Sequence, residues 1–462
     1  MKFLLVVYDN GSYIHDFPLG LGYIASILKL NGIDVEIYSQ DLHHYPDEHL
    51  TEYLDKNKFD LIGVSVIGGY YQYRKLLSIS GAINASKNRP FFILGGHGPA
   101  PEPEYFLKKT QADVVIIGEG EVTVMELINA LSEHSSLSGV RGIAYREGEK
   151  VFINERQPLI EDIDSIPFPA YDLFPMEYYR LGRGPNVKKS DFCARMLSGR
   201  GCTFKCNFCY RMDKGLRTRK NEAIIEEIQL LKKDYGITYV SFYDELLMSS
   251  LDRIEGLCRA FIKAKINVRW SCNGRLNYAR SDILRLMKEA GCVFINYGIE
   301  CFDDQILKNM NKALTTEQIV KGIEATLESG ISPGYNVIFG NIGENRETLK
   351  KGVEFLLKYD DGAQMRTIRP VTPYPGCPLY YYAIEKGLLD DCEDFYERKH
   401  LNSDLLAVNF TDLTDDEFHE ALFEANEKLL DNYFRKQFQS YVEQAKKLYL
   451  EKDVSFRGFR QA

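Results

Sequence analysis

The feature that most constrains the fold of this chain is a repeated alternation of short apolar runs with helix-length segments. In the N-terminal third these runs are bounded by Gly, Asp or Pro, as buried strands usually are, and they cover 3–8, 35–39, 61–66, 91–94 and 114–117. Because the runs are almost continuously hydrophobic, they predict a parallel sheet that helices cover on both faces. Residues 1–135 are therefore expected to form a doubly wound, Rossmann-like α/β domain, with ligands beyond the carboxyl ends of its strands.

The alternation of strand and helix signals resumes in residues 191–380. The candidate strands there are 195–200, 238–243, 268–272, 293–299, 334–339 and 365–371. Six strands with intervening helices predict a partial (β/α)6 barrel, whose active site would lie at the carboxyl ends of the strands.

The segments that flank this barrel differ in character. Residues 136–190 contain an expected hairpin, formed by 140–146 and 150–154, and a proline-rich bridge at 164–174 that we expect to be extended and packed. Residues 381–462 are expected to form a helical extension, and its main helix, 414–447, begins with an N-cap at Thr414. We expect this extension to pack against the barrel mouth, and a lid over the substrate is the alternative.

Composition and charge narrow the classes of function. The net charge of −9 on 462 residues argues against a general nucleic-acid-binding surface, which needs a basic face. No apolar stretch approaches the length of a membrane span, and the apolar run at the N-terminus is short for a signal peptide. Ten irregularly scattered cysteines are typical of reduced thiols, so we expect a cytoplasmic protein.

Three cysteines within eight residues, Cys202, Cys206 and Cys209, carry the strongest chemical signal. Thiolates hold iron–sulfur clusters, and three of them leave one iron of a [4Fe-4S] cluster without a protein ligand. The alternatives are disulfides or structural zinc with Cys193 as a fourth ligand. Zinc sites favour paired CxxC units, however, and the chain has no second CxxC. The spacing therefore favours a cluster with an open coordination position.

The run Gly201-Cys-Thr-Phe-Lys-Cys-Asn-Phe-Cys-Tyr210 closely resembles the radical S-adenosylmethionine (SAM) enzymes in its CxxxCxxC spacing and its aromatic neighbours. The resemblance implies that the open iron binds the methionine end of SAM. It also implies that an electron from the cluster cleaves SAM to a 5′-deoxyadenosyl radical.

Polar residues at the predicted strand ends match this family and imply its contacts with SAM. Asp244 and Glu245 stand at the position of the amino-group binder, and Glu300 at that of the ribose contact. Asn273 and Arg275 close a third strand, where an arginine can grip a carboxylate. Gly340 would let bare backbone meet adenine, although Asn336 replaces a glycine that often begins this motif. For each polar residue, a structural ion pair or helix cap is the rival role.

Glycines gather after three strands of the N-terminal domain. Glycine lets the backbone approach a bulky ligand closely, and these residues are Gly68, Gly69, Gly95, Gly96, Gly98, Gly118 and Gly120. Together with Pro18–Tyr23 and the downstream cysteines, these turns look like the cobalamin-binding domain that precedes many radical SAM domains. The resemblance implies cobalamin contacts at these glycines and at His97, for which a loop position without ligand contact is the alternative.

One departure concerns the cobalt ligand. The DxHxxG signature of histidine-ligated cobalamin proteins is absent. In the nearest match, 41–46, Pro46 replaces the glycine and the segment follows the wrong strand. We therefore expect base-off cobalamin without a histidine below the cobalt, and a domain that has lost its cofactor is the alternative.

The turn after the sixth strand, 369–379, is similar to a Thr-Pro-Tyr-Pro-Gly-Thr turn of cobalamin-dependent radical SAM proteins. Tyr374 is the candidate catalytic or substrate-pocket residue in it. Cys377 stands at the threonine-like position, where a lone cysteine is more often an inert small hydrophobe than a reactive group.

The combined resemblance implies a cobalamin-dependent radical SAM methyltransferase that acts on a small molecule in an anaerobic setting. A flavodoxin or ferredoxin-type donor would reduce the cluster, methylcobalamin would methylate the substrate radical, and a second SAM would restore the methyl group. The alternatives are a non-methylating radical reaction, with or without cobalamin, and a non-catalytic SAM or cobalamin sensor. The sensor is disfavoured because binding alone needs no reducible cluster.

Overall fold

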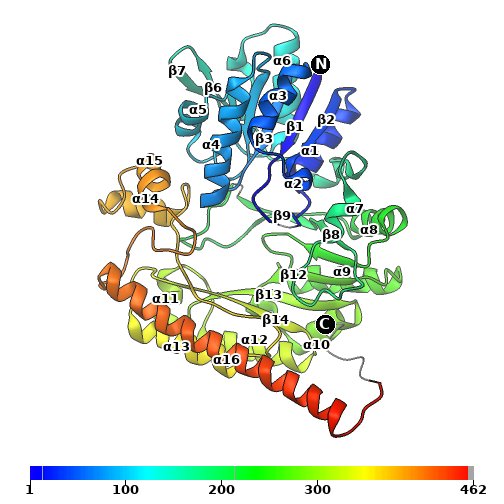
Figure 1. Ribbon diagram of the computed structural model, residues 1–462, viewed down its shortest axis with the longest axis vertical. Helices are drawn as coiled ribbons and strands as arrows, with labels where there is room; N and C mark the ends of the chain where they lie inside the picture. Colours follow the sequence, from blue (N-terminus) through cyan, green and yellow to red (C-terminus); the bar gives the residue numbers. More distant parts are fainter. Residues whose placement is uncertain (13, 213, 456–462) are drawn as a thin grey trace.

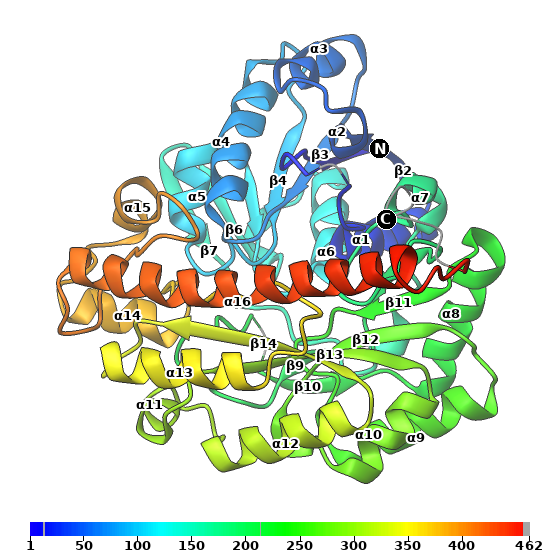
Figure 2. The ribbon, with the colours of Figure 1, turned by 60° about the horizontal axis from the view of Figure 1, so that its bottom comes forward.

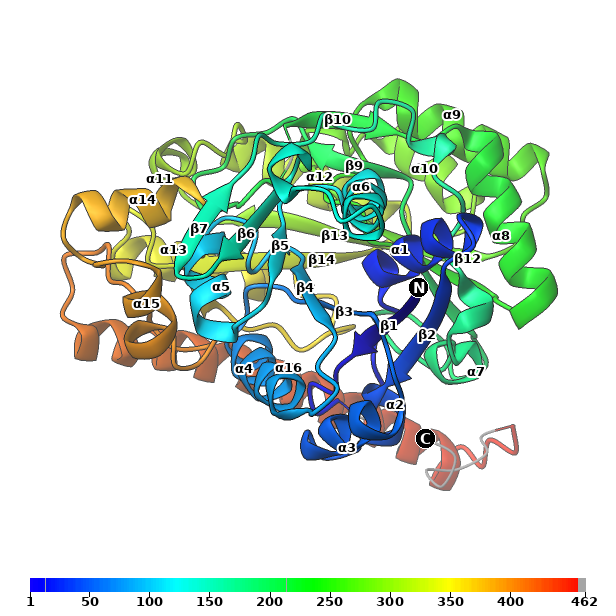
Figure 3. The same cartoon turned by 90° about the horizontal axis from the view of Figure 1, so that it is seen from above.

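The computed structural model describes residues 1–12, 14–212 and 214–455, and its two large sheets lie one above the other (Figure 1). The N-terminal α/β domain forms the upper part of Figure 1, and the second sheet with its helices forms the lower part. The view from above shows the first sheet over the second, with helix α16 running along one side (Figure 3).

The N-terminal sheet has the strand order β2-β1-β3-β4-β5-β6-β7, in which the first five strands are parallel. These five strands confirm the predicted runs to within one or two residues: β1 Lys2–Val7, β2 Asp34–Ser39, β3 Leu61–Ser65, β4 Phe91–Gly95 and β5 Val114–Ile116. The helices that cover them are α1 Leu19–Leu30, α2 Gln40–His43, α3 Glu48–Lys56, α4 Tyr70–Ala85, α5 Pro103–Thr110 and α6 Gly120–Ser132. This order is one of the two common doubly wound topologies, as predicted.

The hairpin expected in the bridge extends the first sheet. Its strands, β6 Ile143–Glu147 and β7 Lys150–Ile153, add antiparallel to β5 at the sheet edge. After it come turns at Ile163–Ser165 and Tyr171–Leu173 and the short helix α7 Met176–Tyr179. Phe17 of the first domain packs against three aromatic rings of this bridge at centroid distances of 5.0 to 5.6 Å, from Tyr171, Phe174 and Tyr179. These contacts confirm that the bridge is packed, but its two helical turns differ from the extended backbone expected for 164–174.

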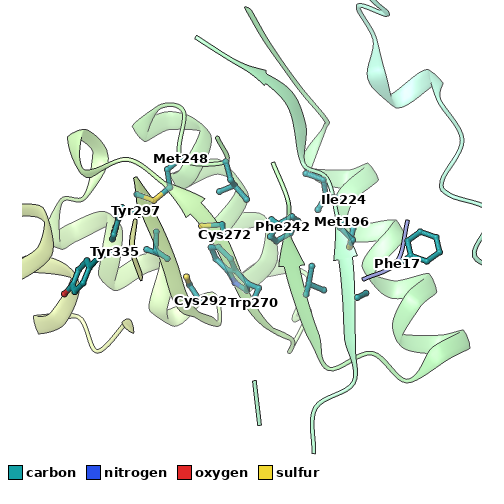
Figure 4. Close-up of a cluster of buried hydrophobic side chains, with 14 of the residues drawn as sticks. Phe17, Met196, Ile224, Phe242, Met248, Trp270, Cys272, Cys292, Tyr297 and Tyr335 are labelled. Atoms are coloured by element: carbon teal, nitrogen blue, oxygen red, sulfur yellow. The ribbon is translucent and has the colours of Figure 1, made fainter. Parts of the chain in front are cut away.

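The second sheet is a curled, fully parallel half-barrel with the order β15-β14-β13-β12-β11-β8. Its strands are β8 Cys193–Met196, β11 Tyr239–Phe242, β12 Arg269–Gly274, β13 Cys292–Glu300, β14 Ser332–Phe339 and β15 Arg369–Pro370. Its helices are α8 Asn221–Tyr235, α9 Leu251–Lys263, α10 Ser281–Glu289, α11 Asp304–Asn309, α12 Thr316–Glu328 and α13 Arg346–Lys358. The fully buried Trp270 packs edge-on against Phe242 and Phe261 in the core between this sheet and its helices (Figure 4).

Two predicted barrel strands differ in the structure. The run 195–200 is not one strand: β8 ends at Met196, and Ser198 turns the chain because its N–H and hydroxyl both donate to Asp244. The chain then enters β9 Gly199–Cys202, which pairs antiparallel with β10 Gly215–Thr218. The cysteine loop therefore follows β9, and not a barrel strand as expected.

The run 365–371 shrinks to the two residues of β15. Arg366 is drawn out of the strand into ion pairs with Asp360 and Asp361, and the backbone of Ile368 pairs with the side chain of Asn426. These bonds take the place of strand ladder bonds.

The C-terminal extension is helical at both ends. It comprises α14 Pro378–Glu385, α15 Cys392–Asp394, a π-helical turn at Phe395–Lys399 and the long helix α16 Asp415–Tyr449. The predicted start of α16 is confirmed, because Thr414 and Glu417 form a reciprocal capping box. Helix α16 lies along α13 and β14 at the side of the half-barrel, where Phe418 stacks on Phe339 at 4.7 Å (Figure 2). Among the described residues, no helix is both long and apolar enough to cross a membrane.

Candidate cluster and cofactor site

The three cysteines of the CxxxCxxC run occupy one hairpin loop. Pairing of Cys202 with Gly215 closes this loop at the ends of β9 and β10. Gly201 has a φ of +86°, and a Cβ there would lie 2.4 Å from the Gly215 carbonyl oxygen, so this position requires glycine. We call residues 199–218 the cluster hairpin.

The loop of the cluster hairpin rests on the barrel. The Asn207 N–H donates to the Met310 carbonyl at 2.9 Å, and Asn311 donates to the Lys205 carbonyl at 2.9 Å. Asn207 and Asn341 exchange two side-chain hydrogen bonds of 3.0 Å. These bonds fix the backbone on both sides of the second cysteine, Cys206.

Two buried cations stand beside the cysteines. The Arg275 guanidinium lies 3.4 Å from the ring centre of Phe204, and it donates to the carbonyl of Lys312. The Lys312 ammonium donates to Glu300 at 2.7 Å, and both side chains are buried. A hydrogen bond from Cys209, with Lys312 and Arg275 nearby, lowers the pKa of Cys206 to about 6. The surroundings therefore favour a thiolate, the form that ligates iron, at Cys206. The shared hydrogen bond raises the pKa of Cys209, and burial raises that of Cys202.

The arrangement of the thiols fits a cluster. A cubane takes its three protein thiolates on three separate irons, so they need not converge on one point. Within the described residues, no three His, Cys, Asp or Glu side chains gather as ligands of a single ion. The three thiols share one hairpin loop, and Cys206 hydrogen-bonds with Cys209, so Cys202, Cys206 and Cys209 stay the predicted ligands of a [4Fe-4S] cluster.

Glu300 is held in an uncommon backbone conformation. Its φ is +67°, and the register between β13 and β14 shifts at this point. A Cβ on Gly298 would lie 2.4 Å from the Glu300 carboxylate and 2.9 Å from the Lys312 ammonium, so this glycine makes room for the pair. A non-glycine residue in this conformation is strained, and such strain is often found at functional sites.

The structure brings only part of the predicted SAM set to the cluster hairpin. Arg275 and Glu300 adjoin it through Phe204 and Lys312. Gly340 is bounded by α16, because a Cβ there would lie 2.7 Å from the Phe418 ring. Its N–H donates to Glu344, so its backbone donor is already used.

Asp244 and Asn273 form a network within the protein. The buried Asp244 carboxylate accepts hydrogen bonds from Ser198, and burial raises its pKa to about 6. Asn273 donates to the Asp244 carbonyl at 2.9 Å. Of the carboxylates at this strand end, the neighbouring Glu245 is the exposed one. The SAM contacts of all these residues stay predictions.

Lys312 is the residue of this site that the sequence reasoning missed. It lies in a loop after α11, between Asn311 and Ala313, and not at a strand end. Strand-end reasoning therefore had no means of selecting it, and only its burial against Glu300 marks it.

The carboxyl ends of the two sheets face each other. Asp16, in the loop after β1, pairs with Arg195 of β8 at 2.6 Å. A Cβ on Gly68, after β3, would lie 3.2 Å from Tyr374, and His97, after β4, has its ring centre 6.1 Å from that of Tyr210. Gly376 lies against both Tyr210 of the cluster hairpin and Pro101 of the first domain. The predicted glycine turns therefore lie opposite the cysteines.

Parts of the first domain at the carboxyl ends of β3 and β4 would fit a large apolar cofactor. Ile67 and Tyr71, after β3, have exposed fractions of 57% and 63%, although both are apolar. Gly95 has open space around its missing side chain. Gly96 is required by close contact with the backbone of Val66, and a Cβ on Gly98 would be tight against the backbone of Ile67. Exposed apolar side chains beside open glycine backbone suit the face of a corrin ring.

The histidine that follows β1 of this domain lies outside the 41–46 segment. The 41–46 segment follows β2, and its Asp41 accepts a hydrogen bond from Tyr179. Sequence reasoning missed His15, which does follow β1. His15 is buried, and its Nε2 bonds to Asp9 at 3.1 Å. That ring nitrogen is thus committed to a carboxylate.

The turn after β15 is placed between the domains. Tyr374 is half-buried and packs on His400 and Phe395, with Gly68 opposite. Cys377 is fully buried, and burial raises the pKa of its thiol to about 11. Such a thiol is unreactive at neutral pH, in keeping with its reading as a small hydrophobe.

A three-cysteine hairpin between a half-barrel and a doubly wound domain defines a class of iron–sulfur enzyme with a second cofactor domain. Residues 196–356 match the radical SAM superfamily, and residues 11–128 match the B12 binding domain. An uncharacterized methyltransferase of Pyrococcus horikoshii is 30% identical over 400 residues, which are 84% of each chain. An anaerobic magnesium-protoporphyrin IX monomethyl ester cyclase of Rubrivivax gelatinosus is 26% identical over 82% of this chain and 68% of its own.

Among solved structures, the radical SAM methyltransferase TsrM of Kitasatospora setae, with cobalamin and a [4Fe-4S] cluster bound, has the same fold. Its TM-score is 0.73 at 17% identity, over 92% of this chain and 88% of its own. The chain belongs to the radical SAM enzymes that carry a cobalamin-binding domain. It is an enzyme of the methyltransferase-like kind, and its cofactors are a [4Fe-4S] cluster, SAM and cobalamin.

Proposed function

We propose that this protein methylates an unactivated position of a small-molecule substrate that binds between the two domains. The observation that carries the proposal is the facing of the two carboxyl edges, with the cluster hairpin on one side and the glycine turns on the other. A substrate between them would reach both cofactors. The methyltransferase relative with 84% coverage supports methyl transfer as the reaction.

The cofactors supply the radical and the methyl group, and the protein supplies binding and orientation. Cys202, Cys206 and Cys209 would hold the cluster, with one iron left for SAM. Glu300, kept in place by Lys312, would accept hydrogen bonds from the ribose hydroxyls. Arg275 contributes positive charge for the methionine carboxylate, and the exposed Glu245 accepts from the methionine ammonium.

Other residues position the second cofactor and the electron supply. Ile67, Tyr71 and Gly95 offer an apolar edge to a corrin ring, which we expect to be base-off with no histidine ligand. Tyr374 would close the substrate space near Gly68. The single electron would come from a flavodoxin or ferredoxin-type donor in the cytoplasm.

The test uses anaerobically reconstituted protein with hydroxocobalamin, SAM and a chemical reductant. Expected products are 5′-deoxyadenosine and S-adenosylhomocysteine, the latter in an amount at least equal to the corrin content. The Cys206→Ala variant should form no deoxyadenosine and serves as the control. Deoxyadenosine without any S-adenosylhomocysteine would refute methylation and favour the non-methylating chemistry of the cyclase relative.

A further inference from the structure

A buried group of four charges joins the cluster hairpin to the cobalamin-binding domain. Glu119 accepts from Arg200 at 2.7 Å and from Arg217 at 2.8 Å, and Glu121 accepts from Arg200 at 2.6 Å. Glu119 is the N-cap of α6 and Glu121 lies in its first turn, and the two arginines belong to β9 and β10. We call these four residues the clamp.

The cluster hairpin has little intrinsic stability without the clamp. Its stem is a two-stranded ribbon of four residues a strand, and isolated ribbons of this kind are marginally stable in water. Arg200 and Arg217 are directly opposite each other in its register. Like charges in that arrangement destabilise a ribbon unless carboxylates neutralise them. The stem therefore depends on the two glutamates of the other domain.

The clamp lies close to the cluster ligands along the chain. Arg200 precedes Cys202 by two residues on β9. The Glu119 carboxylate also accepts the N–H of Ile160 at 2.9 Å, and Arg217 donates to the carbonyl of Ile160 at 2.8 Å. The clamp thus fixes the hairpin stem against the first domain and the bridge together.

In the first domain, the clamp adjoins one of the glycine turns predicted to contact cobalamin. Gly118 and Gly120 flank Glu119 directly, and Gly118 has a φ of +98°. Both glutamates are buried, with side-chain exposures of 5% and 7%. Although burial opposes ionisation, hydrogen bonds from Arg217, Ile160 and Arg200 lower the pKa of Glu119. Glu119 is therefore ionised near neutral pH.

We propose that Glu119, Glu121, Arg200 and Arg217 are positioning residues that fix the distance between the [4Fe-4S] cluster and the cobalt. One rigid turn of the first domain would carry cobalamin contacts on its glycines and hold the cluster hairpin through its glutamates. The inference rests on the proposed function in assuming that both cofactors are bound. It adds a device that sets their separation.

The test measures this separation directly and needs no substrate. The full chain is reconstituted with iron, sulfide and hydroxocobalamin and then reduced until both the cluster and Co(II) are paramagnetic. Pulsed dipolar electron paramagnetic resonance gives the distance distribution between the two centres. The wild-type protein should show one narrow distance, and the Glu119→Gln/Glu121→Gln variant should lose it while retaining iron and corrin.

A matched control separates positioning from general stability. Asp360 is buried like the glutamates and pairs with the buried Arg366, but this pair lies between α13 and β15, outside the domain contact. The Asp360→Asn variant should lower the melting temperature and leave the distance unchanged. If the double variant does not fold, the single Glu121→Gln variant, which removes one bond from Arg200, should still broaden the distance distribution relative to the wild type.

Two results would overturn the inference. One is an unchanged distance in the glutamate variants, and the other is an equal loss of the distance in Asp360→Asn. A wild-type protein that takes up no corrin would refute the proposed function and this inference together, whereas the first two results would leave the proposed function intact.

Discussion

The buried pair of Lys312 and Glu300 gives the sharpest prediction about the site. The Lys312→Met variant keeps much of the side-chain volume and removes the ammonium, so the Glu300 carboxylate stays buried without its main partner. Breaking a buried ion pair in this way costs about 3–5 kcal/mol. We expect the low end, about 3 kcal/mol, because the Arg275 cation adjoins Lys312 and offsets part of the loss.

A loss of this size is readily measured. It corresponds to a fall in melting temperature of roughly 6–12 °C for a folding unit of 150–250 residues. Differential scanning calorimetry of the reconstituted protein gives the shift, and deoxyadenosine formation gives the functional effect, which should be a large loss. The Lys312→Met/Glu300→Gln double variant removes the unpaired charge and should regain most of the stability but not the activity. A shift below about 2 °C with normal deoxyadenosine formation would refute the argued role of the pair.

Three further predictions concern other parts of the molecule. The pKa of Asp244 is raised to about 6, so its proton stabilises the folded state at low pH, and this contribution is lost as the pH rises through 6. Between pH 5 and 7 the free energy of unfolding of the wild type, measured by chemical denaturation, should therefore fall by on the order of 1 kcal/mol relative to that of Asp244→Asn. Parallel profiles of unfolding free energy against pH would contradict this. The electron paramagnetic resonance spectrum of Co(II) should lack nitrogen coupling to cobalt and should be the same in His15→Ala, because His15 is hydrogen-bonded to Asp9. Strong nitrogen coupling that disappears in the variant would show a histidine ligand. Thr414→Ala should cost about 1 kcal/mol by removing the N-cap of α16, measured by thermal unfolding, with the exposed Ser440→Ala in the same helix as a control that changes little.

The fold could be predicted from the sequence because its strands are buried on both faces. Phe3, Ile62 and Phe92 lie in runs with almost no polar interruption, and such runs can form only the inside of a covered sheet. The ribbon of β9 and β10 escaped notice because Gly199, Gly201 and Gly215 give it no apolar pattern. Its strands exist because of ion pairs with a distant segment, which no local signal reveals.

The candidate site could be predicted only where its residues lie close together in the sequence. The three cysteines could be recognised from their spacing in the sequence, because one hairpin loop contains all three. Lys312 and the clamp depend on contacts between segments that are far apart in the chain, such as Glu119 with Arg217. Gly340 was selected because it lies at a strand end, but the Phe418 ring of α16 leaves no room for a side chain there. From the sequence alone, this packing requirement cannot be distinguished from a contact with a ligand.

The position of α16 has a consequence for how this protein can be shortened. Since β15 has only two residues, most of β14 has no strand partner on that side, and its backbone could pair with another chain. Helix α16 covers this margin, with Phe418 on Phe339 and Asn426 on the backbone of Ile368. A truncation before Thr414 would uncover an adhesive sheet margin, and the shortened protein would associate with itself even though every predicted cofactor contact remained.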